Sequence, residues 1–273
     1  MLKKIAAIND LSGIGRCSLT VALPIISALK VQCCPFPTAI LSSQTGYPEY
    51  TFLDFTNNMS NYYSVWKNLN INFDCIYSGF LGSKEQIDIV CKFICENKDS
   101  FVIVDPVMGD EGKLYPVFDI DMCKKIKNLV KHADLVTPNL TEACLLTDNE
   151  YKKDTFSELE IINIAKDICK LGPRKVIITG IISNDNIINL AYDKDLDKYF
   201  VTSIKYNNKS YSGTGDIFTS IVSGLLMRDY SLEEATKEAT MFISEVVNYT
   251  SQFDTDRNDG VIFEQFLNML TSL

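Results

Sequence analysis

One short stretch of the chain, Gly213-Thr214-Gly215-Asp216, has residue types that suit the binding and transfer of an anionic group. The two glycines let successive backbone N–H groups point into one concavity, and the apolar helix that should follow adds its unpaired amides and its positive dipole end. A carboxylate repels a bound phosphate, so Asp216 needs another task. A carboxylate at this position could accept the proton of an alcohol as the alcohol oxygen attacks phosphorus. The alternative is a glycine turn in which Asp216 only stabilises the helix dipole.

A second polar pair follows the apolar run at residues 134–138. Asn139 and Glu142 are three residues apart at a predicted helix start, which places an amide oxygen and a carboxylate on one face. Hard oxygen ligands of this kind hold Mg²⁺ through its waters. The alternative is a helix cap, with Asn139 or Thr141 capping the helix and Glu142 in its first turn.

A third acidic group ends the apolar run at residues 101–105. Asp105 is its last residue, and Pro106 blocks continuation into a helix. The sequence then predicts a mobile acidic loop at residues 109–112. Its carboxylates could complete a Mg²⁺ site or line the phosphate path, and a solvated loop is the alternative for Asp110 and Glu111.

The first strand is followed by a turn that carries Asp10, Ser12, Gly13 and Gly15. The two glycines match part of a dinucleotide-binding pattern, but Ser18 occupies the third glycine position and no acidic residue ends the next strand. We therefore interpret Asp10 and Ser12 as groups that hydrogen-bond a polar small molecule. No Walker A lysine follows any glycine loop, which excludes a P-loop enzyme.

Histidine and cysteine usage indicates neither a triad nor a zinc site. His132 is the only histidine, and we predict a surface position for it at a helix end. The nine cysteines include no CxxC pair, so we expect reduced, mostly buried thiols and a cytoplasmic protein. Cys91 and Cys95, four residues apart on one helix face, are predicted to be core thiols.

The charge balance argues against polyanionic partners. The chain of 273 residues has 26 basic and 35 acidic residues, a net charge of −9, which leaves no basic face for nucleic acid or an anionic membrane. Lys3 and Lys4 precede only four apolar residues, too few for a signal peptide, and the chain has no apolar run of the roughly 18 residues that span a membrane.

The elements that must position these residues alternate along the chain. Short apolar runs separated by helical patterns are typical of βα units on a mostly parallel sheet. Strands are predicted at residues 3–8, 31–41, 74–78, 101–105, 134–138 and 175–179. Their carboxyl ends should meet at one edge of the sheet, where ligands bind in open α/β folds.

The last third of the sequence departs from the alternation of parallel strands and helices. Residues 187–193 and 198–204 should form an antiparallel hairpin, which makes the sheet mixed. Helices are then predicted at Thr214–Met227, Ser231–Tyr249 and Gly260–Leu270. Because no linker, repeat or low-complexity tract interrupts the pattern, residues 1–273 are predicted to form a single domain.

Taken in order, the motifs resemble the ribokinase-like superfamily, and more closely its vitamin kinases, the pyridoxal kinases and the hydroxymethylpyrimidine kinases. The resemblance covers nearly the whole chain. It rests on INDLSGIGRCSLTVALP from residue 8, SSQTGY from 42, SGFLGS from 78, DPVMGD from 105, TPNLTEA from 137, VIITG from 176 and SGTGDIF from 212. The fold it implies is a central, mostly parallel sheet flanked by helices on both faces, with the late antiparallel hairpin.

The resemblance implies roles on the phosphate side of the site. Asp216 would be the catalytic base, and Gly213, Thr214 and Gly215 would form the anion hole for the transferred phosphoryl group. Asn139 and Glu142 would organise Mg²⁺ and the nucleotide phosphates, and Asp105 would support them. Further nucleotide contacts would lie at Thr179, Gly180 and Thr214.

It also implies a ring-binding side, formed by Asp10, Ser12, Gln44, Thr45, Tyr47 and Phe80. Three of these residues depart from the family pattern. Animal-type pyridoxal kinases usually carry Ser at the position of Asp10 and His at that of Gln44, whereas an Asp at the first position is closer to the hydroxymethylpyrimidine kinases. Phe80 stands where many relatives have Tyr. These departures concern ring specificity and leave phosphoryl transfer intact.

We therefore predict an ATP-dependent kinase that phosphorylates the 5′-hydroxymethyl group of pyridoxal, pyridoxamine or pyridoxine. One alternative is a hydroxymethylpyrimidine kinase of thiamine synthesis, and another is a non-catalytic nucleotide-binding sensor on the same fold. The expected cofactors are ATP and Mg²⁺, with a monovalent cation as an open further requirement. Related kinases are commonly dimers, so a homodimer is expected, with neither nucleic acid nor membrane as a partner.

Overall fold

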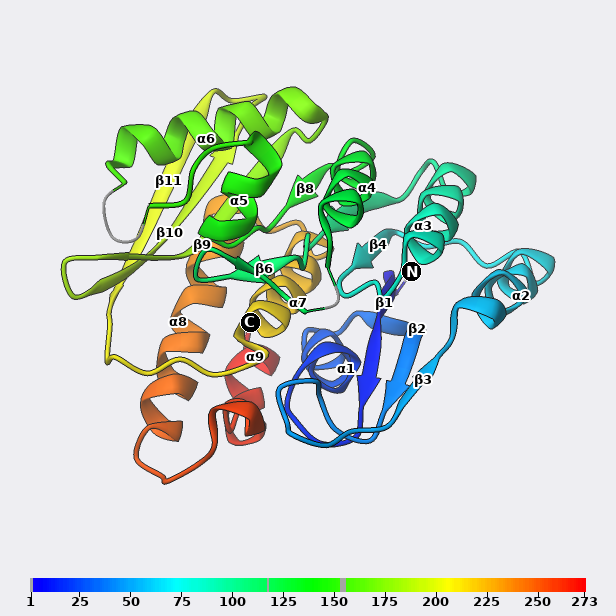
Figure 1. Cartoon of the computed structure of the whole chain (residues 1–273), viewed down its shortest axis with the longest axis horizontal. Coiled ribbons are helices and arrows are strands. Elements are labelled where there is room, and N and C mark those ends of the chain that lie inside the picture. Colours follow the sequence, from blue (N-terminus) through cyan, green and yellow to red (C-terminus); the bar gives the residue numbers. More distant parts are fainter. Residues whose placement is uncertain (1, 117, 153–155) are drawn as a thin grey trace.

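A nine-stranded mixed sheet forms the centre of the molecule (Figure 1). The computed structural model describes residues 2–116, 118–152 and 156–273. Across the sheet the strands run in the order β11 (Lys198–Lys205), β10 (Asn186–Asp193), β9 (Lys175–Ser183), β8 (Leu135–Val136), β5 (Phe101–Val104), β4 (Cys75–Ser78), β1 (Lys4–Ser12), β2 (Gln32–Leu41) and β3 (Phe52–Asp54).

The middle of the sheet is parallel, as the sequence predicts. Strands β9, β8, β5, β4, β1 and β2 pair in parallel with their neighbours. Strand β8 has only two residues, but a bridge between Asn139 and Thr179 extends its pairing with β9. The six predicted strands are therefore confirmed, and their carboxyl ends lie along one edge.

Both ends of the sheet are antiparallel. The predicted hairpin of β10 and β11 is confirmed, and β10 also pairs antiparallel with β9 through a turn at Asn184 and Asp185. Both turn residues have positive φ, as a tight hairpin turn requires. At the opposite edge, β3 pairs antiparallel with β2, a strand that the sequence analysis did not predict.

Helices cover both faces of the sheet, as expected (Figure 1). One face carries α1 (Ser18–Ala28), α7 (Thr214–Leu226), α8 (Leu232–Thr250) and α9 (Leu267–Thr271). The other carries α2 (Thr56–Asn68), α3 (Lys84–Glu96), α4 (Ile120–Val130), α5 (Leu140–Thr147) and α6 (Glu158–Leu171). Alternate residues of β1 enter the two cores, Ile5 and Ala7 on the first face and Ala6 and Ile8 on the second. This two-sided burial explains the continuous apolar runs in the parallel strands.

The prediction of a helix over Gly260–Leu270 is wrong. Residues 257–259 and 264–266 form 3₁₀ turns, and only Leu267–Thr271 is α-helical. Gly260 has φ +73, which an ordinary helix does not accommodate, and Val261 and Phe263 are both buried with a spacing of two. Residues 260–263 form an irregular segment on the core, in which the Phe263 N–H donates to the Val261 backbone oxygen at 2.9 Å.

The acidic stretch at residues 109–112 also differs from expectation. It forms a small hairpin, β6 (Gly109–Asp110) with β7 (Lys113–Leu114), in place of the predicted mobile loop. Glu111 and Gly112 both have positive φ and make the tight turn between the strands.

The histidine and cysteine predictions have mixed outcomes. His132 is exposed just beyond α4, as predicted. All nine cysteines are free, and five of them are buried. The prediction that Cys91 and Cys95 are core thiols is wrong for Cys95, which is exposed on α3, whereas the half-buried Cys91 packs against the core. In the described parts of the chain, no helix has the length and apolarity needed to cross a membrane.

Candidate active site

The carboxyl edge of the parallel strands and the first turn of α7 meet in one place. Asn9, near the end of β1, donates a hydrogen bond to Asp216 in that turn. A Cβ at Gly215 would lie 3.9 Å from a carboxylate oxygen of Asp105, which directly follows β5. Residues that are more than 200 positions apart in the chain thus form one site, as the parallel topology predicts.

Asp216 accepts one hydrogen bond on each carboxylate oxygen. The Asn9 side chain donates to Oδ1 at 3.0 Å, and the Ser18 backbone N–H donates to Oδ2 at 2.9 Å. Burial raises the pKa of Asp216 to about 6, and the nearby Asp10 carboxylate adds to the rise, while the two donors oppose it. Each oxygen keeps acceptor capacity, so the side chain could take a proton from a bound hydroxyl.

The glycine stretch before Asp216 forms the start of α7 under a tight steric constraint. Gly213 has φ +79, and a Cβ there would lie 1.9 Å from the backbone oxygen of Arg16. Gly215 is exposed. The first amides of a helix have no partner within it, so α7 presents unpaired N–H groups and its positive dipole end beside Asp216. The arrangement suits an anion.

Asp10 is held by two serine hydroxyls. Ser18 Oγ donates to Oδ1 at 2.5 Å and Ser12 Oγ donates to Oδ2 at 2.7 Å. The Asp10 residue is 7% exposed, and burial raises its pKa while the two hydroxyls lower it. Ser12 is fully buried, so its hydroxyl holds Asp10 from the interior of the protein and is not itself open to a ligand.

Asn9 is a site residue to which the sequence analysis assigned no role. It is 1% exposed, its Oδ1 accepts the N–H groups of Asp10 and Phe80 at 3.0 and 2.9 Å, and its Nδ2 donates to Asp216. A Cβ at Gly79 would come within 2.3 Å of Nδ2, so glycine there makes room for the amide. The signal available in the sequence was an amide side chain at the end of a buried strand, directly before Asp10.

The loop with Gln44, Thr45 and Tyr47 is tied to a distant loop near the C-terminus. Gln44 Nε2 donates to the side-chain and backbone oxygens of Asn258 at 3.1 and 3.2 Å, and the Tyr47 hydroxyl donates to Asp259. Thr45 is exposed. The sequence analysis did not connect these two segments, because no local pattern joins residues more than 200 positions apart.

Phe80 follows β4 at the same edge of the sheet. Its side chain is half-buried, and its ring packs edge-on against Phe118 with the centroids 6.4 Å apart. Its N–H is held by Asn9, and its backbone oxygen accepts from Thr38 Oγ1 at 3.1 Å. The backbone of Phe80 is therefore fixed from both sides, with its N–H bonded to the site residue Asn9.

Asn139 and Glu142 form the helix cap that was the alternative to a metal-binding role. Asn139 Oδ1 accepts the N–H of Glu142, and Glu142 Oε2 accepts the N–H of Asn139, both at 2.9 Å. The other Glu142 oxygen accepts the N–H of Met108 at 3.0 Å, and Asn139 Nδ2 donates to the backbone oxygen of Gly109 at 2.8 Å. The pair thus also fixes the strand-to-hairpin segment that follows Asp105.

Two carboxyl groups, those of Asp105 and Glu142, are buried close to each other in this part of the site. Burial raises the pKa of Glu142 to about 8, and burial together with Glu142 and Asp216 raises the pKa of Asp105 well above its usual range. Among the described residues, the Asp105 carboxylate accepts one hydrogen bond, a long one of 3.4 Å from the Thr219 hydroxyl. A cation at this place would favour the charged form of both carboxylates.

The donor set fits a hydrated Mg²⁺ better than a fully protein-bound metal. Within the described segments, no three His, Cys, Asp or Glu side chains are grouped to hold a metal ion. Both Glu142 oxygens accept backbone N–H groups, whereas the Asp105 carboxylate has open acceptor positions. Mg²⁺ commonly uses one or two carboxylates together with waters and substrate phosphates, which matches this arrangement.

Thr179 and Gly180 lie on β9 beside Asn139. Thr179 donates its N–H to the backbone oxygen of Pro138 at 2.9 Å, and Gly180 donates its own to Asn189 Oδ1 at the same distance. Gly180 has φ +68, and no atom lies within 4 Å of the place that a Cβ would take. The exposed backbone of Gly180 therefore leaves space for close approach of a ligand.

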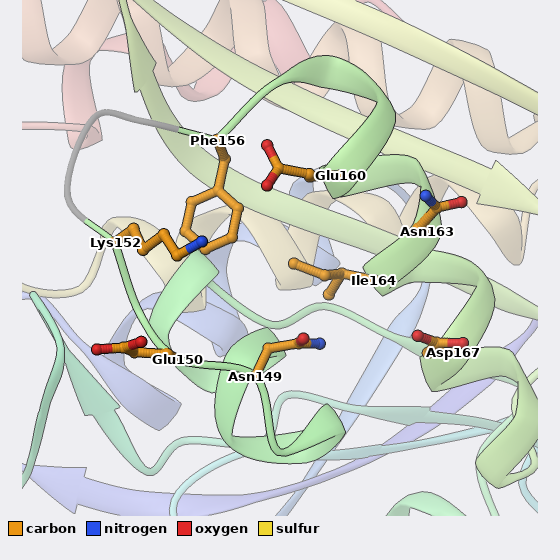
Figure 2. A pocket seen from close by; sticks show the side chains of 8 residues that line it. All are labelled: Asn149, Glu150, Lys152, Phe156, Glu160, Asn163, Ile164 and Asp167. Atoms are coloured by element: carbon orange, nitrogen blue, oxygen red, sulfur yellow. The ribbon is translucent and has the colours of Figure 1, made fainter.

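A separate hollow of about 240 Å³ lies between the end of α5 and α6 (Figure 2). Its lining is Asn149, Glu150, Lys152, Phe156, Glu160, Asn163, Ile164 and Asp167. None of the predicted site residues contributes to this lining, so the hollow is not part of the site around Asp216.

Comparison with known proteins shows what the chain is similar to. Residues 23–261 match the family model described as phosphomethylpyrimidine kinase. A candidate phosphomethylpyrimidine kinase of Bacteroides thetaiotaomicron VPI-5482, in an orthorhombic crystal form with pyridoxal, is 41% identical and superposes with a TM-score of 0.95 over 99% of this chain and 96% of that one.

Two curated relatives differ in activity. The pyridoxal kinase of Dictyostelium discoideum is 26% identical, over 81% of this chain and 78% of that protein. The hydroxymethylpyrimidine/phosphomethylpyrimidine kinase of Aquifex aeolicus is 29% identical, over 62% of this chain and 65% of that protein.

The glycine at the start of α7 can be tested against a matched glycine elsewhere in the site. Gly213→Ala and Gly180→Ala both place an alanine at positive φ, which costs about 1–2 kcal/mol. Only Gly213→Ala also forces a Cβ against the Arg16 backbone, so we expect it to lower the free energy of unfolding by about 1–3 kcal/mol more than Gly180→Ala. Urea denaturation of both variants measures the difference, and equal losses would contradict the steric constraint.

Proposed function

We propose that this chain, which belongs to the phosphomethylpyrimidine kinase family within the ribokinase-like fold, phosphorylates the 5′-hydroxymethyl group of a B6 vitamer with ATP. Family membership makes the chain a phosphotransferase of the pyridoxal kinase or hydroxymethylpyrimidine kinase type. The observation that carries the choice of a B6 vitamer is the 41% identical structure with pyridoxal, which aligns over nearly the full length of both chains.

The ring side of the proposed site is chemically suited to a B6 vitamer. Asp10 as a carboxylate accepts hydrogen bonds, so it favours a ring that presents a donor, such as a phenolic hydroxyl or a protonated ring nitrogen. Its two serine partners occupy one acceptor position on each oxygen and fix the carboxylate in place. In this proposal the half-buried Phe80 ring, which packs against Phe118, contacts the vitamer ring. In this proposal Ser12 acts through Asp10, and Gln44, Thr45 and Tyr47 belong to the loop that closes the ring side.

The phosphate side supplies positioning and a base. Asp216 accepts the proton of the vitamer hydroxyl as the hydroxyl oxygen bonds to the γ-phosphorus of ATP, and the bond from phosphorus to the bridging oxygen breaks to release ADP. The amides of Gly213, Thr214 and Gly215 stabilise the negative charge that develops on the transferred group. Thr179 and Gly180 provide backbone against which the nucleotide rests.

Mg²⁺ would be held through Asp105, with Asn139 and Glu142 fixing the surrounding backbone. When bound, the ion supplies positive charge that neutralises the nucleotide phosphates. The raised pKa values of Asp105 and Glu142 support this assignment, because a cation would stabilise both side chains in their charged form.

The second candidate function is hydroxymethylpyrimidine phosphorylation. The Aquifex aeolicus relative favours it, and so does Asp10, which can also accept a hydrogen bond from an exocyclic amine. A non-catalytic sensor is disfavoured, because Asp216 is present and is held by two donors beside the start of α7.

A direct comparison of alcohol substrates tests the proposed substrate. ADP formation is measured in a coupled assay with pyridoxal, pyridoxine, pyridoxamine and hydroxymethylpyrimidine, each with ATP and Mg²⁺. We expect the highest kcat/KM with a B6 vitamer. A kcat/KM for hydroxymethylpyrimidine well above that for every vitamer would establish the second candidate instead.

Replacement of the proposed base tests the mechanism. Asp216→Asn keeps the shape of the side chain and removes the proton acceptor, so we expect kcat to fall by about 10²- to 10⁴-fold. Nucleotide binding, measured by calorimetry, should persist because backbone amides form the anion nest. Asp121→Asn, on the exposed side of α4, is the control for loss of an acidic residue. Near-normal turnover by Asp216→Asn would contradict the assignment.

The pH dependence of turnover should reflect the environment of Asp216. Its pKa is raised to about 6 by burial and by Asp10, and a base works only when deprotonated. We therefore expect kcat/KM for the vitamer to fall as the pH drops through about 6, rather than near the value of about 3.9 of a free aspartate. The measurement is a pH–rate profile at saturating ATP, and an acidic limb centred near pH 4 would show that the base is not shifted.

A further inference from the structure

Ser18, the first residue of α1, has an unusual backbone conformation for its location. Its φ is +53, in the left-handed region that favours glycine. Among the residues that the structure describes, ten non-glycine residues have positive φ; nine of these are exposed, and Ser18 alone is buried, at 5% exposure. Strained backbone at a buried position persists only where its surroundings hold it.

Two hydrogen bonds hold Ser18, and both go to carboxylates of the site. Its backbone N–H donates to Asp216 Oδ2 at 2.9 Å, and its hydroxyl donates to Asp10 Oδ1 at 2.5 Å. The two bonds leave the same residue from its backbone and from its side chain. The direction of the N–H and the anchoring of the hydroxyl are therefore linked through a single Cα.

The geometry points to Ser18 as a positioning residue that couples Asp10 to Asp216, an inference that rests on the proposed function. A serine without further contacts prefers the right-handed region, where its N–H would point in another direction. The short hydroxyl bond to the buried Asp10 opposes that rotation. Asp10 thus serves two purposes, since it faces the ring and also anchors the residue whose N–H holds the base.

Asn9 provides a second, parallel connection between the same two carboxylates. Its Oδ1 accepts the Asp10 N–H, and its Nδ2 donates to the other oxygen of Asp216. The base is therefore clamped from both sides by residues of the first strand and turn. A ring that shifts Asp10 would change the placement of the base, so recognition of the alcohol and its activation share the same supports.

The competing explanation is that Ser18 merely begins α1. Ser12 provides the matched control: its hydroxyl bonds to the same Asp10 carboxylate, whereas the donors to Asp216 among the described residues are Asn9 and Ser18. Loss of either hydroxyl weakens the hold on Asp10, whereas only loss of the Ser18 hydroxyl frees the N–H that faces Asp216.

The experiment compares the unmodified chain with Ser18→Ala, Ser12→Ala and Ser18→Asn by two readouts. The first is amide hydrogen exchange at residue 18, followed by NMR, which reports the bond to Asp216 without any turnover. The second is the kcat and the KM for the alcohol. Asparagine tolerates positive φ and carries a side-chain donor for Asp10, so Ser18→Asn should restore what Ser18→Ala removes.

We expect the residue 18 amide to exchange about tenfold faster or more in Ser18→Ala than in Ser12→Ala, and to be protected again in Ser18→Asn. In Ser18→Ala, kcat should fall by about 10- to 100-fold, because the base is displaced, whereas Ser12→Ala should act mainly on KM. If Ser18→Ala does not fold, Ser18→Gly, which takes positive φ freely and lacks the hydroxyl, should show the same rapid exchange.

Protected exchange in Ser18→Ala or Ser18→Gly, or equal kcat and KM changes in the Ser18→Ala and Ser12→Ala variants, would overturn the inference. Failure of the unmodified chain to turn over any of the four alcohols would contradict the proposed function instead. The exchange measurement separates the two cases, because it depends only on the bond between Ser18 and Asp216.

Discussion

The site depends on the contact between the first strand–helix turn and the start of α7. Gly213 lies so close to the Arg16 backbone that no side chain fits between them, and this approach brings Asp216 within hydrogen-bond distance of Asn9 and Ser18. Without those donors, burial would raise the pKa of Asp216 further and favour its neutral form. The contact therefore sets both the position and the charge of the proposed base, and it joins the first strand–helix turn to a segment about 200 residues later in the chain.

The part of the site around Asp105 and Glu142 attracts a cation, whereas the start of α7 attracts an anion. Asp105 and Glu142 are buried near each other, and the pKa of each is raised, so both carboxyl groups favour the neutral form until a cation arrives. Glu142 is fixed by backbone donors, and the same bonds hold the segment after Asp105 in place. A rigid acidic cluster beside an anion nest suits a ligand that brings both a cation and phosphates, and a nucleotide with Mg²⁺ is such a ligand.

Much of the fold could be predicted from the sequence. Continuous apolar runs identified the parallel strands because such strands are buried on both faces, and two short runs close together after the last of them identified the hairpin of β10 and β11. Local patterns failed where tertiary contacts decided the conformation. Gly260 and the buried Val261 and Phe263 form an irregular segment against the core instead of a helix, and the acidic residues 109–112 fold into a hairpin.

For the site, the sequence by itself determined which residue types are available and that they follow the strands of one sheet. Asp10, Asp105, Asn139 and Asp216 could be named because each stands directly after or near an apolar run or opens a helix. Only the tertiary structure decided how they are supported. Asn9 and Ser18 hold Asp216 across about 200 residues, and Gln44 and Tyr47 bind the loop of Asn258 and Asp259 across a similar separation. Hydrogen bonds of this kind depend on where the chain returns in space, and local propensity and spacing carry no information about that.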